Sequence, residues 1–212
     1  MSSRSRFHLL FVVATLVLAS VSCGDVVRTG RSPMFLTIDL LQASTGNKPT
    51  QFSGALLSDV LTIVTTGGTC TQQIPCQVIF DDFGQVVLRT PLKNVTNPSS
   101  PNAPTTNNEV TITRYRVVYR RTDGRNVQGV DVPYAFDGGV TGTVPLGGTV
   151  TLSFELVRHV AKLEPPLAQL RSNGSLIYTI ADITFFGKDR VGNDIQATGS
   201  IQVDFGNFAD QS

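Results

Sequence analysis

The sequence VTITRYRVVYRR, residues 110–121, alternates between apolar and charged side chains. One parity holds Tyr115, Val117 and Tyr119, and the other holds Arg114, Arg116 and Arg120. Successive side chains of a β-strand point to opposite faces of a sheet, so this pattern is typical of a strand with one buried face. We therefore expect an aromatic face that packs into a core and an arginine face in solvent.

The same alternation predicts further strands on both sides of this segment. They cover 35–41, 149–157, 177–186 and 195–205. The inward parity of the first would hold Leu36, Ile38 and Leu40, and that of the second Val150, Leu152, Phe154 and Leu156. The last two segments are joined by GKDRVGND, which predicts a C-terminal hairpin.

Less regular segments lie between these strands. Residues 56–65 are apolar without a clear period, and 78–80 and 86–88 flank the spacer DDFGQ, which predicts a hairpin. Residues 161–171 can form a helical turn that the two prolines at 165 and 166 keep short. Many short strands with little helical pattern predict an all-β chain of two antiparallel sheets packed face to face.

Two segments resemble known families. Residues 112–124, ITRYRVVYRRTDG, are similar to the central-strand segment of fibronectin type III domains, and residues 185–205 resemble the closing hairpin of bacterial immunoglobulin-like domains. The resemblance implies an immunoglobulin-like sandwich that presents loops and sheet edges to a partner. The chain departs from that pattern because it has no Trp and no cysteine pair spaced to bridge the sheets.

The N-terminus has the layout of a secretory signal. Arg4 and Arg6 precede an apolar run over 7–19, which is shorter than the roughly 20 residues of a membrane-spanning helix. Small residues then lead to Cys23, which resembles the lipobox of bacterial lipoproteins, although Ser20 stands where that family usually has Leu. The resemblance implies cleavage after residue 22 and a lipid on Cys23; the alternative is an ordinary secreted protein.

The expected organisation is a lipoprotein signal peptide over 1–22, a tether over 23–33 and one elaborated domain over 34–212. Within it, residues 97–108, NPSSPNAPTTNN, cannot form a helix or a central strand. They are either a domain boundary or a long surface loop, and we expect a Pro/Asn-rich loop at 96–108. The protein would lie in the cell envelope, on the periplasmic or outer-membrane face, anchored to the membrane by its lipid.

The cysteine count agrees with this organisation. If Cys23 carries lipid, Cys70 and Cys76 remain as a pair. They bracket TQQIP, with no CxxC spacing and no nearby His, so a structural disulfide is favoured over a metal or redox site.

Composition and motifs argue against several classes of function. A net charge of +1 without a basic cluster excludes nucleic acid as a partner. His159 is the single histidine after the signal, so no site with two imidazoles can form, and we expect this side chain to be solvated at a strand end. With no GxSxG or HExxH motif, we expect no enzyme, no metal and no cofactor.

Acidic residues offer two weaker hypotheses. Asp81 and Asp82 are adjacent and would point to opposite faces of a strand, which disfavours paired-acid hydrolysis. These acids, or Asp189 with Asn193 and Asp194, have the oxygen ligands that calcium prefers. Their tendency to form turns explains them more simply.

The row Arg114, Arg116 and Arg120 is the candidate partner surface. Three cations on one strand face repel one another unless cross-strand acids or an anionic partner relieve them. We expect a structural or interaction module of the envelope, with a protein or glycan partner. The alternative is a carrier or accessory subunit that holds a small apolar ligand between the sheets.

Overall fold

Residues 32–93 and 106–208 are described by the computed structural model. The expected signal peptide, Cys23, nearly all of the tether and residues 96–105 of the Pro/Asn-rich loop lie outside these ranges.

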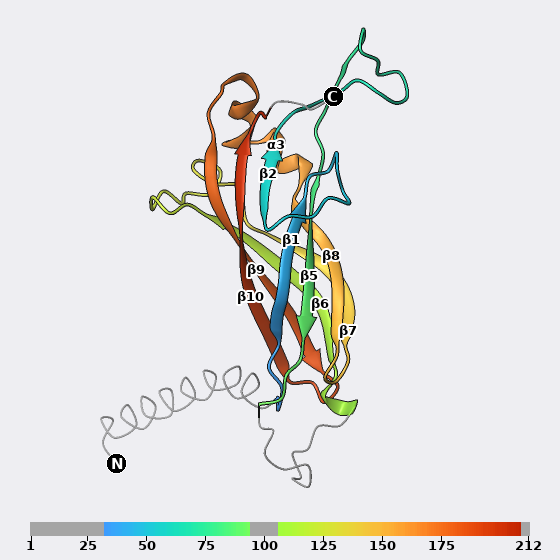
Figure 1. The fold of residues 1–212 in the computed structure, drawn as a ribbon. Helices are drawn as coiled ribbons and strands as arrows, with labels where there is room; N and C mark the ends of the chain where they lie inside the picture. Colours follow the sequence, from blue (N-terminus) through green and yellow to red (C-terminus); the bar gives the residue numbers. More distant parts are fainter. Residues whose placement is uncertain (1–31, 94–105, 209–212) are drawn as a thin grey trace, which may run out of the picture.

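The described chain is mostly β-structure, with a few short helices (Figure 1). The strands are β1 (Thr37–Ser44), β2 (Ala55–Asp59), β3 (Thr62–Val64), β4 (Cys76–Val78), β5 (Asp82–Arg89), β6 (Val110–Arg120), β7 (Phe136–Val144), β8 (Thr149–Val157), β9 (Ile177–Asp189) and β10 (Asp194–Gly206). The helices are η1 (Thr106–Asn108), α3 (His159–Leu163) and η2 (Leu167–Ser172).

The strands form three sheets, in the orders β1-β5-β8, β2-β10-β9-β6-β7 and β3-β4. The long strands of the five-stranded sheet curl into a half-barrel (Figure 1). A register irregularity in β6 between Ile112 and Arg114 contributes to this shape, because a bulge bends a strand and increases its twist. The expectation of purely antiparallel sheets is wrong at one edge, where β2 pairs with β10 in parallel.

Aromatic side chains pack the two larger sheets together. The ring of Phe154 on β8 lies 5.1 Å from that of Tyr115 on β6 and 5.2 Å from that of Phe185 on β9. Farther along, Tyr119 and Phe205 stack edge to face at 5.6 Å. All of these side chains are buried, so the inward parity predicted for β6 and β8 is confirmed.

Other expectations are confirmed in outline. The segment 149–157 is a strand over its whole predicted length, and the C-terminal hairpin is formed by β9 and β10, both of which extend into the predicted connection. Short helical segments, α3 and η2, flank the two prolines at 165 and 166.

Strand β1 departs from simple alternation. Its register with β5 shifts between Ile38 and Leu40, so Leu41 rather than Leu40 packs on the core. Leu40 is 45% exposed, which corrects its predicted inward position. The physical reason is the bulge, because one extra residue moves every later side chain to the opposite face.

The hairpin predicted around DDFGQ is also wrong. Residues 82–85 of this segment lie in β5, which begins at Asp82 and pairs with β1 and β8, while β4 pairs with β3. Gly84 belongs in this strand because the ring of Phe154 lies where its Cβ would be. Asp82 and Gly84, which favour a turn locally, therefore lie in a central strand.

Candidate functional site

The arginine row lies on the outer face of the five-stranded sheet, opposite the aromatic core. The Arg114 guanidinium lies 3.0 Å from the Asp137 carboxylate of β7 and 3.7 Å from the centre of the Phe186 ring of β9. Arg120 pairs with Asp182 of β9 at 2.6 Å. Cross-strand acids therefore relieve two of the three cations, as sequence reasoning allowed.

Arg116 lies between these two pairs and is exposed. Its neighbours across the strands are Asp137, which is engaged by Arg114, and Thr184. Within residues 32–93 and 106–208, its guanidinium has neither an ion pair nor a hydrogen bond. The row thus contains one cation that is available to an external anion.

A second basic group follows β6 in the turn over 122–126. The guanidinium groups of Arg121 and Arg125 both lie on the Asp123 carboxylate, at 2.6 and 2.8 Å. Hydrogen bonds from Arg121 first, and then from Arg125, hold the pKa of Asp123 well below its usual range. Both arginines are therefore already paired with an acid.

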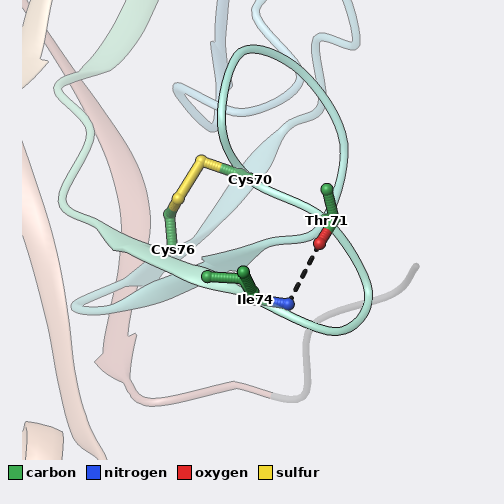
Figure 2. The surroundings of a disulfide bond; sticks show 4 residues. All are labelled: Cys70, Thr71, Ile74 and Cys76. Carbon is green, nitrogen blue, oxygen red and sulfur yellow. Dashed lines mark hydrogen bonds between the residues drawn. A yellow bond between two sulfur atoms is a disulfide. The ribbon is translucent and has the colours of Figure 1, made fainter.

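The predicted disulfide is confirmed: Cys70 and Cys76 are bonded, with their Cα atoms 5.3 Å apart (Figure 2). Within the ring, the backbone N–H of Ile74 donates to the Thr71 hydroxyl at 3.0 Å, and each of these residues also donates to the carbonyl of the other. The closed loop leaves the Ile74 side chain 69% exposed. It connects β3 to β4 at the end of the molecule opposite the start of β1 (Figure 1).

A buried polar cluster was missed by sequence reasoning. The Lys162 Nζ of α3 lies 2.8 Å from Oδ2 of Asp82 at the start of β5, and these side chains are 1% and 2% exposed. The same oxygen accepts a hydrogen bond from the Ser58 hydroxyl of β2 at 2.6 Å, and Oδ1 accepts one from the Gly46 backbone N–H at 3.0 Å. The only local signal was the visible pair of acids at 81 and 82, since a lysine on a short helix is normally read as exposed.

The environment of this cluster is strongly desolvated. Burial raises the pKa of Asp82, and the nearby Lys162 opposes this rise only in part. Burial also raises the pKa of Tyr119, and the negative charge of Asp82 adds to that effect. The Tyr119 hydroxyl donates to the carbonyl of Leu156. Four chain segments therefore meet at a buried carboxylate.

His159 begins α3, which corrects its predicted position at a strand end. Its ring is half-exposed, and Nδ1 lies 2.8 Å from Oδ1 of Asp81. Partial burial acts to raise the pKa of Asp81, but hydrogen bonds from the His159 backbone and ring, together with its charge, lower it overall. Among the described contacts of His159 there is no serine, so this pair lacks the nucleophile of a triad.

The acids considered for calcium are used by the β9–β10 turn. The Asp189 carboxylate accepts the backbone N–H groups of Val191 and Asn193 and the side-chain amide of Asn193. Asp194 pairs with Lys188 at 3.1 Å. No group of three or more His, Cys, Asp or Glu side chains suited to a metal occurs in the described parts of the chain.

A shallow groove of about 220 Å³ opens near one end of β9 and β10. It is lined by Thr122, Tyr178, Thr179, Ile180, Gln202 and Asp204. Asp204 is 7% exposed, and its Oδ1 accepts no hydrogen bond from any described residue. The groove therefore places the Asp204 carboxylate, one oxygen of which has no hydrogen bond from a described residue, near the turn over 122–126.

Comparison of the chain with models of known protein families and with curated protein sequences found no match. Among the helices of the described residues, none is long and apolar enough to cross a membrane.

Proposed function

We propose that this protein is a lipid-anchored interaction module of the cell envelope, with an immunoglobulin-like sandwich that binds a protein or glycan partner. The observation that carries the proposal is the outer face of the five-stranded sheet. There Arg116 is exposed between two arginine–carboxylate pairs and has no partner among the residues that the structure describes. The packing of Phe154 on Tyr115 and Phe185 supports the sandwich, because it joins inner faces of the two larger sheets.

The other two arginines of the row are paired with acids, so Arg116 is the one that would contact a partner. Arg114 and Arg120 are already paired with Asp137 and Asp182, and exposed ion pairs of this kind are weak. A guanidinium offers several N–H donors in a planar fork that matches a carboxylate, phosphate or sulfate group. Arg116 retains that whole donor set, and an anionic group on a partner would complete the row.

The Phe186 ring restrains Arg114 on the same surface. The Arg114 guanidinium lies over its ring, an arrangement worth about 0.5–1 kcal/mol at an exposed site. A stacked arginine loses less conformational freedom when a partner binds than one that moves in solvent. The face is therefore partly preorganised for contact.

The expected lipid anchor is consistent with a domain that is displayed away from the membrane surface. A lipid on Cys23 would attach the protein through the tether of residues 23–33, whose extended reach is at most about 35 Å. The strand that follows the tether, β1, starts at one end of the domain, and the disulfide loop lies at the other (Figure 1). The arginine row lies along the domain, between these two ends.

The filled interior favours this module over the ligand carrier. Tyr115 has the rings of Phe136, Phe154 and Phe185 around it, with centroids at 6.2, 5.1 and 6.3 Å. Close-packed rings occupy the space between the sheets that an apolar ligand would need at this level.

The test is crosslinking of the intact protein in its own cells, followed by mass spectrometry of what is captured. Arg116→Glu reverses the unpaired charge, and Arg125→Glu makes the same change of net charge at a paired turn residue. We expect a defined protein or glycan to be captured by the wild type and by Arg125→Glu, and to be lost with Arg116→Glu. Equal capture by both variants, or no specific capture by the wild type, would contradict the proposal.

A further inference from the structure

The buried lysine and aspartate bring an amine nitrogen next to a carboxyl group. Lys162 comes from α3 and Asp82 from β5. Nζ of the lysine lies 2.8 Å from Oδ2, an oxygen bonded to Cγ of the aspartate, and both side chains are buried. When a protein holds two reacting groups this close, the effective concentration of one group at the other is very high. A reaction that is negligible in solution then becomes accessible.

Burial also favours the reactive, neutral form of the Asp82 carboxyl group. An ion pair taken out of water loses most of its hydration, and in this site the pKa of Asp82 is raised by burial. Transfer of one proton along the Lys162–Asp82 hydrogen bond converts the ions into a neutral amine and a neutral carboxylic acid. A desolvated neutral lysine is a good nucleophile.

The two oxygens of Asp82 have different partners. Oδ1 accepts the Gly46 backbone N–H at 3.0 Å, which is placed to stabilise negative charge that develops on this oxygen during attack at Cγ. Oδ2 accepts the Ser58 hydroxyl at 2.6 Å as well as Lys162. Only glycine fits at position 46, because a Cβ there would collide with the Asp81 carbonyl oxygen and the Phe80 side chain.

We propose that Lys162 and Asp82 condense spontaneously into an isopeptide bond that ties α3 to β5. The bond between Nζ and Cγ forms and the bond between Cγ and Oδ2 breaks. Oδ2 keeps the electron pair of the broken bond and, with its own proton and one from Nζ, leaves as water. Oδ1 becomes the amide oxygen on the Gly46 N–H, and Ser58 assists departure of Oδ2 by donating its proton toward it.

The link has a structural consequence for the end of the domain. Helix α3 spans only His159–Leu163, and its N-cap residue, Arg158, provides no side-chain hydrogen bond. A helix of this length has little stability of its own. The covalent bond would hold it over the ends of β2 and β5 and would replace two buried charges by one neutral amide.

The experiment is peptide mass spectrometry on the full-length protein isolated from its membrane, denatured, reduced and digested with trypsin. We expect the peptide 159–171 to be found joined to the peptide that contains Asp82, with a combined mass lower by one water. An amide on Nζ blocks cleavage after Lys162, so the free tetrapeptide HVAK, residues 159–162, should be missing. Release of that tetrapeptide without any branched peptide would overturn the proposal, as would a branch to an acid other than Asp82.

Two variants assign the roles. Ser58→Ala should lower the crosslinked fraction relative to the wild type, and an unchanged fraction would refute the part given to Ser58. Lys188→Arg changes an exposed lysine paired with Asp194 and should leave the crosslink complete. The measurement on the wild type decides the main claim even if substitutions in the cluster prevent folding.

Discussion

Substitution of Phe185 by Ala tests the packing of the two larger sheets. Phe185 is fully buried on β9, and its ring contacts Phe154 of the other sheet at 5.2 Å. Removal of a buried phenylalanine side chain costs about 3–5 kcal/mol from lost transfer free energy and the cavity that remains. We expect a loss of about 4 kcal/mol, since edge-to-face rings add about 0.5–1.5 kcal/mol beyond burial.

The next residue provides the matched control. Phe186 lies on the opposite face of the same strand and stacks with Arg114 in partial contact with solvent. Phe186→Ala should cost only about 1 kcal/mol, mainly the lost stacking. The two variants change the same atoms one residue apart, so their difference measures which face is buried.

The assay is urea unfolding followed by tyrosine fluorescence and far-UV circular dichroism, because the chain has Tyr but no Trp. The midpoint should fall sharply for Phe185→Ala and slightly for Phe186→Ala, with an unchanged slope in both. Equal losses, or the larger loss for Phe186→Ala, would refute the register of β9, because a slip by one residue exchanges the two faces.

Two further outcomes are expected. Cys23→Ala should move the protein from the membrane fraction to the soluble fraction, and unchanged fractionation would end the anchor hypothesis. Asp81 has a lowered pKa in the folded state, so its pairing with His159 should contribute stability above the unfolded-state value of about 3.9 and lose it as the pH falls through the lower folded value. Asp81→Asn should therefore be less stable than the wild type at pH 5, with a difference that shrinks on acidification; a difference independent of pH would contradict this.

The arginine face was predictable because its signal is local. The alternation over 110–121 specifies which side chains share a face whatever strands lie beside it. It did not reveal which arginine lacks a partner, since Asp137 and Asp182 are far from Arg116 in sequence and reach the row only through the pairing of β6 with β7 and β9.

The buried contact between Lys162 and Asp82 could not be predicted from the sequence, for a related reason. Asp82 lies in a segment whose composition favours a turn, and Lys162 lies on a helix too short to show a periodic pattern. Their contact depends on β5 pairing with β8 and on the position of α3 after β8. No spacing in the chain indicates a pair separated by so many residues.

The sequence by itself determined the mostly β character, the buried faces of β6 and β8, and the Cys70–Cys76 disulfide. These follow from side-chain alternation and from a short cysteine spacing, which act within a few residues. Only the tertiary structure decided the parallel pairing of β2 with β10, the central place of β5, and the meeting of Lys162 with Asp82. The physical reason is that an amphipathic strand can pair with many others, and the choice among them depends on the packing free energy of the whole core.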